Sequence, residues 1–197
     1  MFSIANEIAY KNKMINARQG EIFEDNTYPL GPSCWFNVVG ETTDKQYVEN
    51  QGKLLLRLFV KLYEHEGKLP QIYIITPFRR IKLNLQNLIR DLDNWMHLLN
   101  NTLIKPPAKH ELSKWCSGRI GTVHTFQGRQ ENIVFFVLGV DNNSQGFANW
   151  VASKPNLLNV ALTCAKNRFY VIGDKQLWAR QNYFTQLAKD LPTKDLG

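Results

Sequence analysis

Hydrophobic residues fall along the chain in short continuous runs that are separated by longer amphipathic segments. The runs at 72–76 and 133–138 are almost wholly apolar, and further segments predict strands at 34–39, 119–123 and 169–172. Strands without polar alternation are typical of a parallel sheet that is covered on both faces. The pattern therefore predicts a buried parallel sheet.

The segments between these runs have the spacing of helices. Within residues 46–64 the leucines at 54, 58 and 62 recur every four positions, and residues 78–92 place apolar side chains on one face. Further helices are predicted at 1–10, 157–165 and within 178–187, and polar connectors at 100–117 and 139–155. Strands that alternate with helices predict one α/β domain, in which right-handed crossovers place helices on both faces of the sheet.

The composition limits the class of protein. A chain of 197 residues suits one such domain, and no apolar run reaches the roughly 18–20 residues that cross a bilayer. The first ten residues lack the features of a secretory signal, so we expect a cytoplasmic protein with no membrane partner. Because the chain opens inside a predicted helix, we also expect residues 1–197 to be one domain of a longer protein.

The cysteines argue against a metal site. Cys34, Cys116 and Cys164 lie far apart and form no CxxC pair, so the sequence predicts neither a zinc site nor a disulfide framework. We expect three reduced thiols.

The formal net charge of +7 favours polyanions, because Lys and Arg release counterions from a phosphate backbone when they bind it. Charge alone leaves nucleic acid and other partners equally open. The connector at 100–117 combines Lys105, Lys109, His110 and Lys114 with Trp115, which suits single-strand binding; a solvated loop is the alternative.

Trp150 and Trp178 lie outside this connector. They are predicted to pack inside the domain.

Two polar segments follow predicted strands. Thr76 and Pro77 end one strand and Arg79 begins a helix, so a hydroxyl and unpaired backbone N–H groups meet at the sheet edge. Residues 121–131 read Gly-Thr-Val-His-Thr-Phe-Gln-Gly-Arg-Gln-Glu and form a turn that places polar side chains within reach of a ligand: Thr122, His124, Gln127 and Arg129. Each segment alone is also compatible with an ordinary loop.

A third segment, at 155–174, is an amphipathic helix that ends in basic residues and runs into a strand. Lys166 and Arg168 stand at this junction, where cations also serve simply to offset a helix dipole.

Together, and in this order, the three segments resemble the second RecA-like domain of superfamily 1 helicases, in particular the 1B branch. The family has a strand ending in Thr-Pro-Tyr/Phe, then T-V-H-x-F-Q-G-K/R-E, then N-V-A-x-T-R-A-K before an aromatic strand and Gly-Asp. The resemblance covers nearly the whole chain and implies a P-loop NTPase fold. No G-x-x-x-x-G-K-S/T is present, so the domain lacks a P-loop of its own.

The resemblance implies partners and a cofactor. ATP and Mg²⁺ would be held mainly by an N-terminal RecA-like domain of the same protein, and this domain would close over the nucleotide while it grips single-stranded DNA or RNA. The isolated domain is expected to be inactive.

Site residues follow position by position. The nucleic-acid set matches Thr76, Pro77, Arg79, Thr122 and His124. The nucleotide set matches Gln127, Gly128, Arg129 and Gln130.

Two positions depart from the family pattern. Gln130 replaces the usual Glu, and Cys164 stands where the family has its arginine finger, a group worth on the order of 10³–10⁵ in rate. A thiol supplies no positive charge. Three explanations stay open: Lys166 or Arg168 substitutes for the arginine, hydrolysis is impaired, or the cysteine is a change in this copy of the domain only. The alternative to a motor domain is therefore a RecA-like module that binds nucleic acid or protein and hydrolyses nothing.

Overall fold

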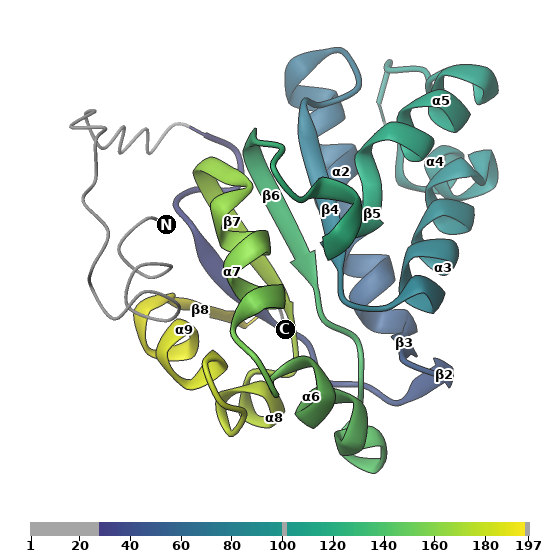
Figure 1. Ribbon diagram of the computed structural model, residues 1–197. Coiled ribbons are helices and arrows are strands. Elements are labelled where there is room, and N and C mark those ends of the chain that lie inside the picture. Colours follow the sequence, from purple (N-terminus) through teal and green to yellow (C-terminus); the bar gives the residue numbers. More distant parts are fainter. Residues whose placement is uncertain (1–27, 100–101, 196–197) are drawn as a thin grey trace.

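A six-stranded parallel sheet forms the centre of the molecule (Figure 1). The computed structural model describes residues 28–99 and 102–195, so the helix expected at 1–10 lies outside the described residues. The strand order is β5-β4-β6-β7-β1-β8, and every neighbouring pair is parallel. The strands are β1 (Cys34–Asn37), β4 (Ile72–Thr76), β5 (Ile120–Thr122), β6 (Glu131–Val137), β7 (Ala165–Gly173) and β8 (Thr193–Asp195).

Helices cover both faces of this sheet, as the sequence predicts. In Figure 1 helix α7 (Asn156–Thr163) lies in front of the sheet, whereas α2 (Glu49–Glu66) lies behind it. The remaining helices are α3 (Arg79–Arg90), α4 (Leu92–Leu99), α5 (Lys109–Arg119), α6 (Gln145–Val151), α8 (Lys175–Ala179) and α9 (Phe184–Asp190), with 3₁₀ turns η1 (Val123–Phe126) and η2 (Asn142–Ser144). Because crossovers are right-handed, links that run in opposite directions along the sheet lie on opposite faces.

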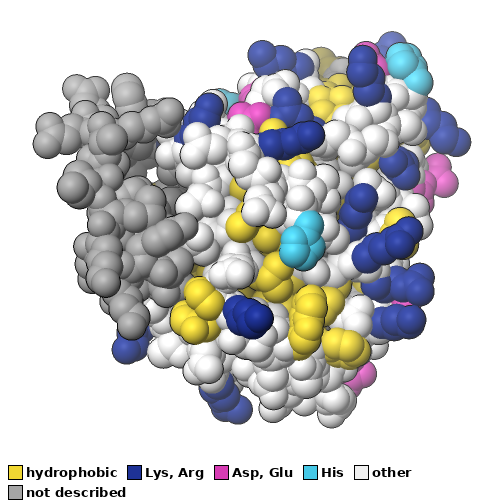
Figure 2. Space-filling model, in the orientation of Figure 1, with side chains coloured by type: hydrophobic (Ala, Val, Ile, Leu, Met, Phe, Trp, Pro, Cys, Tyr) yellow, Lys and Arg dark blue, Asp and Glu magenta, His cyan; other side chains and the backbone are white. Residues whose placement is uncertain are grey.

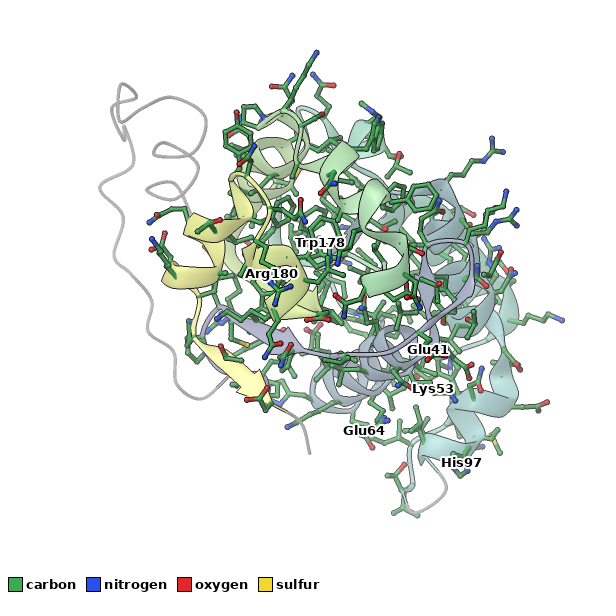
Figure 3. All side chains as sticks on the ribbon, turned by 90° about the horizontal axis from the view of Figure 1, so that it is seen from below. Glu41, Lys53, Glu64, His97, Trp178 and Arg180 are labelled. Carbon is green, nitrogen blue, oxygen red and sulfur yellow. The ribbon has the colours of Figure 1, made fainter. Side chains whose placement is uncertain are left out.

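The core is continuous through the sheet and is rich in aromatic side chains. The apolar strands β4 and β6 place Ile74 and Phe135 beyond the reach of solvent. Trp178 is also fully buried, as predicted, and its indole N–H donates to the Gly139 carbonyl at 3.3 Å. Figure 3 views the molecule from the carboxyl edge of the sheet and shows Trp178 among packed side chains, with Glu64 and His97 at the periphery.

Two predicted connectors are wrong, because each contains a helix. Residues 100–117 include most of α5, whose short apolar face holds Trp115 against the core. Trp115 is 8% exposed, its ring centroid lies 4.6 Å from that of Phe59, and its indole N–H donates to the Pro70 carbonyl at 3.0 Å. A side chain fixed in this way is not available to stack on a nucleic-acid base.

The connector at 139–155 contains η2 and α6. There the prediction for Trp150 is also wrong, since 58% of this residue is exposed.

Three small strands were not predicted. Strands β2 (Thr42–Asp44) and β3 (Tyr47–Val48) form a separate antiparallel hairpin, and β8 adds to the edge of the main sheet beside β1. Strands of two or three residues carry too little periodicity to be recognised.

Gln51 holds together the two segments that follow the ends of β1 and β6 at the carboxyl edge of the sheet. Its side chain is 1% exposed; its amide oxygen accepts from Gly139 N at 2.8 Å and its amide nitrogen donates to the Val38 carbonyl at 3.4 Å. Gln51 therefore connects the segments that leave two strands.

We expect Gln51→Leu to lower the free energy of unfolding by about 1–3 kcal/mol, because it leaves the buried Gly139 N–H without an acceptor. Urea denaturation of the chain measures the change. The exposed residue Gln176 provides a control, since Gln176→Leu should stay within about 0.5 kcal/mol of the parent. Equal urea midpoints for the two variants would show that the hydrogen bonds of Gln51 do not stabilise the fold.

Candidate nucleotide and nucleic-acid site

The link between β5 and β6 has to pass over β4, because β4 lies between them in the sheet. It does so through η1, where the Phe126 ring stacks on Tyr73 of β4 with centroids 4.3 Å apart. The approach is close: a Cβ on Gly121 would lie 2.7 Å from atoms of both Phe126 and Thr125. Gly128 then turns the chain with a φ of 78°, which glycine adopts without strain.

The end of this link is joined to the end of α7. Glu131 N donates to the Cys164 carbonyl at 2.8 Å, and the Gln130 side-chain amide donates to the Thr163 carbonyl at 3.1 Å. The Cys164 thiol donates to the Phe126 carbonyl at 3.4 Å. The second and third motif segments are thus one hydrogen-bonded unit at the amino edge of the sheet.

A groove of about 390 Å³ runs between η1 and α7. It contains three of the predicted residues, His124, Gln127 and Gly128, all of which are exposed. Its full lining is Val123, His124, Gln127, Gly128, Asn156, Leu157, Asn159, Val160 and Thr163. The sequence reasoning missed Asn156, Asn159 and Thr163, although their spacing of three and four residues places them on one face of a helix.

The residues assigned to nucleic acid lie toward the carboxyl edge. Thr76 and Thr122 are register partners on β4 and β5. Thr76 and Pro77 are buried, and no described atom hydrogen-bonds to the Thr76 hydroxyl. Arg79 and His124 are exposed, so they are the members of the set that present side chains to solvent, together with the half-buried Thr122.

The structure brings His124 of the nucleic-acid set together with Gln127 and Gly128 of the nucleotide set in the groove, and it separates the other members of the two sets. Thr122 ends β5 at the carboxyl edge, whereas Gln130 precedes β6 at the amino edge, beside the end of α7. The link that crosses β4 is the covalent connection between them.

Cys164 is buried, with 1% of the residue exposed. Burial raises the pKa of its thiol to about 11, so the group stays neutral at physiological pH and offers no charge. Of the two candidate substitutes, Arg168 is engaged elsewhere: its guanidinium lies 4.3 Å from the Tyr28 ring centroid and its Nε donates to the Gly31 carbonyl at 3.3 Å. Lys166, by contrast, is exposed at the start of β7.

Within residues 28–99 and 102–195, no three His, Cys, Asp or Glu side chains gather closely enough to hold a metal ion. None of the helices in these ranges is long and apolar enough to cross a membrane.

The parallel sheet and the two motif segments beside one groove define the RecA-like domain of a superfamily 1 helicase. A family model described as an AAA domain matches residues 1–176, and the chain belongs to this family. It is also similar to the human protein named probable helicase senataxin, with 25% identity over 193 residues. That match covers 94% of this chain and 6% of the human protein, so the chain spans a small part of the length of its relative.

The close crossing at Gly121 makes a test of the site's framework. We expect Gly121→Ala to destabilise the chain by about 1–3 kcal/mol, because the new methyl group displaces Phe126 from Tyr73. Gly118→Ala is the matched control, since a Cβ there meets no atom within 4 Å and alanine favours its helix. Thermal unfolding should rank Gly118→Ala at or above the parent and Gly121→Ala below it; the reverse order would contradict the crossing.

Proposed function

We propose that this chain is the second motor domain of an ATP-dependent helicase, which completes an ATP site and grips single-stranded DNA or RNA. The observation that carries the proposal is the groove between η1 and α7, because residues from two separate motif segments meet there. The name of the human relative, a probable helicase, supports the same function.

In this proposal the amino edge of the sheet faces the nucleotide. Arg129 and Lys166 are exposed cations, and Gln130, held by its bond to Thr163, presents an amide beside them. An N-terminal RecA-like domain would hold the phosphates and Mg²⁺, and ATP would supply the phosphoanhydride bond whose hydrolysis drives the cycle. The chain's own residues would add positive charge from the opposite side of the cleft.

The carboxyl edge would hold the nucleic acid. Arg79 supplies a positive charge, and Thr122 and His124 supply hydrogen-bonding groups, as phosphate contacts require. Since the link that starts at Thr122 ends beside Gln130, a displacement at the nucleotide would be transmitted directly to the strand-binding residues.

Cys164 favours a second candidate function, a binding module without hydrolysis. The buried neutral thiol cannot stabilise charge on a transferring phosphate. If the domain does support hydrolysis, the exposed Lys166 is the better substitute, because Arg168 is already held by Tyr28 and Gly31.

The two functions differ in the ATPase of the full-length protein. As a motor, it hydrolyses ATP faster with single-stranded DNA or RNA, and Lys166→Ala lowers the stimulated kcat by about tenfold or more, since a charge contact to the transition state is lost. Lys189→Ala, which removes an exposed cation from α9, leaves kcat unchanged. Cys164→Arg raises kcat if the missing guanidinium limits the rate.

A full-length protein that binds single strands without any ATPase would establish the module instead. Unchanged kcat in both Lys166→Ala and Cys164→Arg would remove the amino edge from the mechanism. A gene without a P-loop domain before this chain would contradict the motor outright.

A further inference from the structure

A second hollow, of about 660 Å³, opens at the carboxyl edge of the sheet, between the end of β4 and α6. It is distinct from the groove between η1 and α7, with which it shares no lining residue. Its walls are Gln46, Phe78, Asn143, Ser144, Gly146, Phe147 and Trp150. Figure 2, which has the orientation of Figure 1, shows hydrophobic side chains gathered in the lower part of the view, around the place of α6.

The hollow has an aromatic floor and two aromatic rims. Phe78 forms the floor and is 9% exposed, whereas Phe147 and Trp150 are 42% and 58% exposed. Their ring centroids lie 5.8 and 5.9 Å from that of Phe78. Exposed aromatic side chains that cluster in this way mark a binding surface rather than a core.

Three cations flank the hollow. Lys45 precedes Gln46, Arg79 follows Phe78, and Lys154 follows the end of α6; none of the three has an ion-pair partner in the described part of the chain.

The two nearby carboxylates have partners within the domain, although Asp141 Oδ1 is buried without a hydrogen-bond partner. Asp44 contacts Arg80 and accepts from Asn84, and Asp141 accepts from both the backbone N–H and the hydroxyl of Thr42. The occupant that fits is therefore flat, aromatic and attached to negative charge.

We propose that this hollow holds one unpaired base of the bound single strand, stacked on Trp150 and Phe147. Arg79 and Lys45 then contact the flanking phosphates, and the polar wall residues Gln46 and Asn143 face the edges of the base. Stacking on aromatic side chains next to cations is how proteins hold single strands without reading their sequence. The inference rests on the proposed function and adds a base contact to its phosphate contacts.

The tryptophans of this chain provide a direct readout. All five lie in the described residues, and Trp35, Trp95, Trp115 and Trp178 are buried while Trp150 is exposed. Titration of the 197-residue chain with an oligothymidylate of about twelve nucleotides should quench the emission of Trp150 and shield it from acrylamide. Trp150→Phe should abolish the quenching and keep most of the affinity, since a phenyl ring also stacks.

The affinity test compares oligothymidylate with an abasic strand of the same length. Trp150→Ala should weaken binding of oligothymidylate by on the order of tenfold and leave the abasic strand unaffected. Met96→Ala is the matched control, because Met96 is 57% exposed on α4 and should change neither affinity. Fluorescence anisotropy of labelled strands measures both.

Each other outcome overturns the inference in a recognisable way. Equal losses for both strands, or no loss for either, would leave nucleic-acid binding intact but remove the base from the hollow. Failure of the chain to bind any strand would count against the proposed binding of single-stranded DNA or RNA itself. Shielding of Trp150 that grows with protein concentration, without oligonucleotide, would assign the hollow to contacts between two copies of the chain.

Discussion

The site depends on one constraint: the chain must travel from the end of β5 to the start of β6 across the face of β4. All three strands are parallel, so this link connects opposite edges of the sheet, and residues 123–130 are all that is available to make it. A full crossover helix does not fit in that length. The link instead uses one 3₁₀ turn, with Phe126 stacked on Tyr73, and the residues that do not face β4 are left exposed.

The same crossing also fixes α7. The Phe126 carbonyl, which the 3₁₀ turn presents to α7, accepts a hydrogen bond from the Cys164 thiol. The first residue of β6, Glu131, donates its backbone N–H to the Cys164 carbonyl. The groove is consequently bounded by two elements that are hydrogen-bonded to each other at one end. Movement of α7 relative to η1 would have to break these contacts or carry the link along, which makes the unit suitable for transmitting a displacement between edges.

The sequence predicted this framework because its signals are local and strong. The apolar runs at β4 and β6 are found where expected, and the long helix at 46–64 appears as α2. Helices α5 and α6 were missed because only one face of a short helix is buried, and Trp115 and Trp150 were then assigned to the wrong surroundings. Their exposure is set by the Pro70 carbonyl and by Phe78, which lie far away in sequence. No local pattern contains that information.

Cys164 separates the stability of the fold from the chemistry that the domain would support. The Cys164 thiol is 1% exposed and donates a hydrogen bond to the Phe126 carbonyl at the junction of α7 and β7. This contact stabilises the junction without placing a charge in the core. The groove and the carboxyl edge need no arginine there, since His124, Gln127 and Arg79 are positioned by the crossing and by α3. Under the proposed function, the cysteine would therefore reduce hydrolysis while the surfaces proposed to bind the strand keep their shape. A motor domain and a binding module without hydrolysis would share this same structure, and under the proposed function the exposed Lys166 beside this junction would be the residue that distinguishes them.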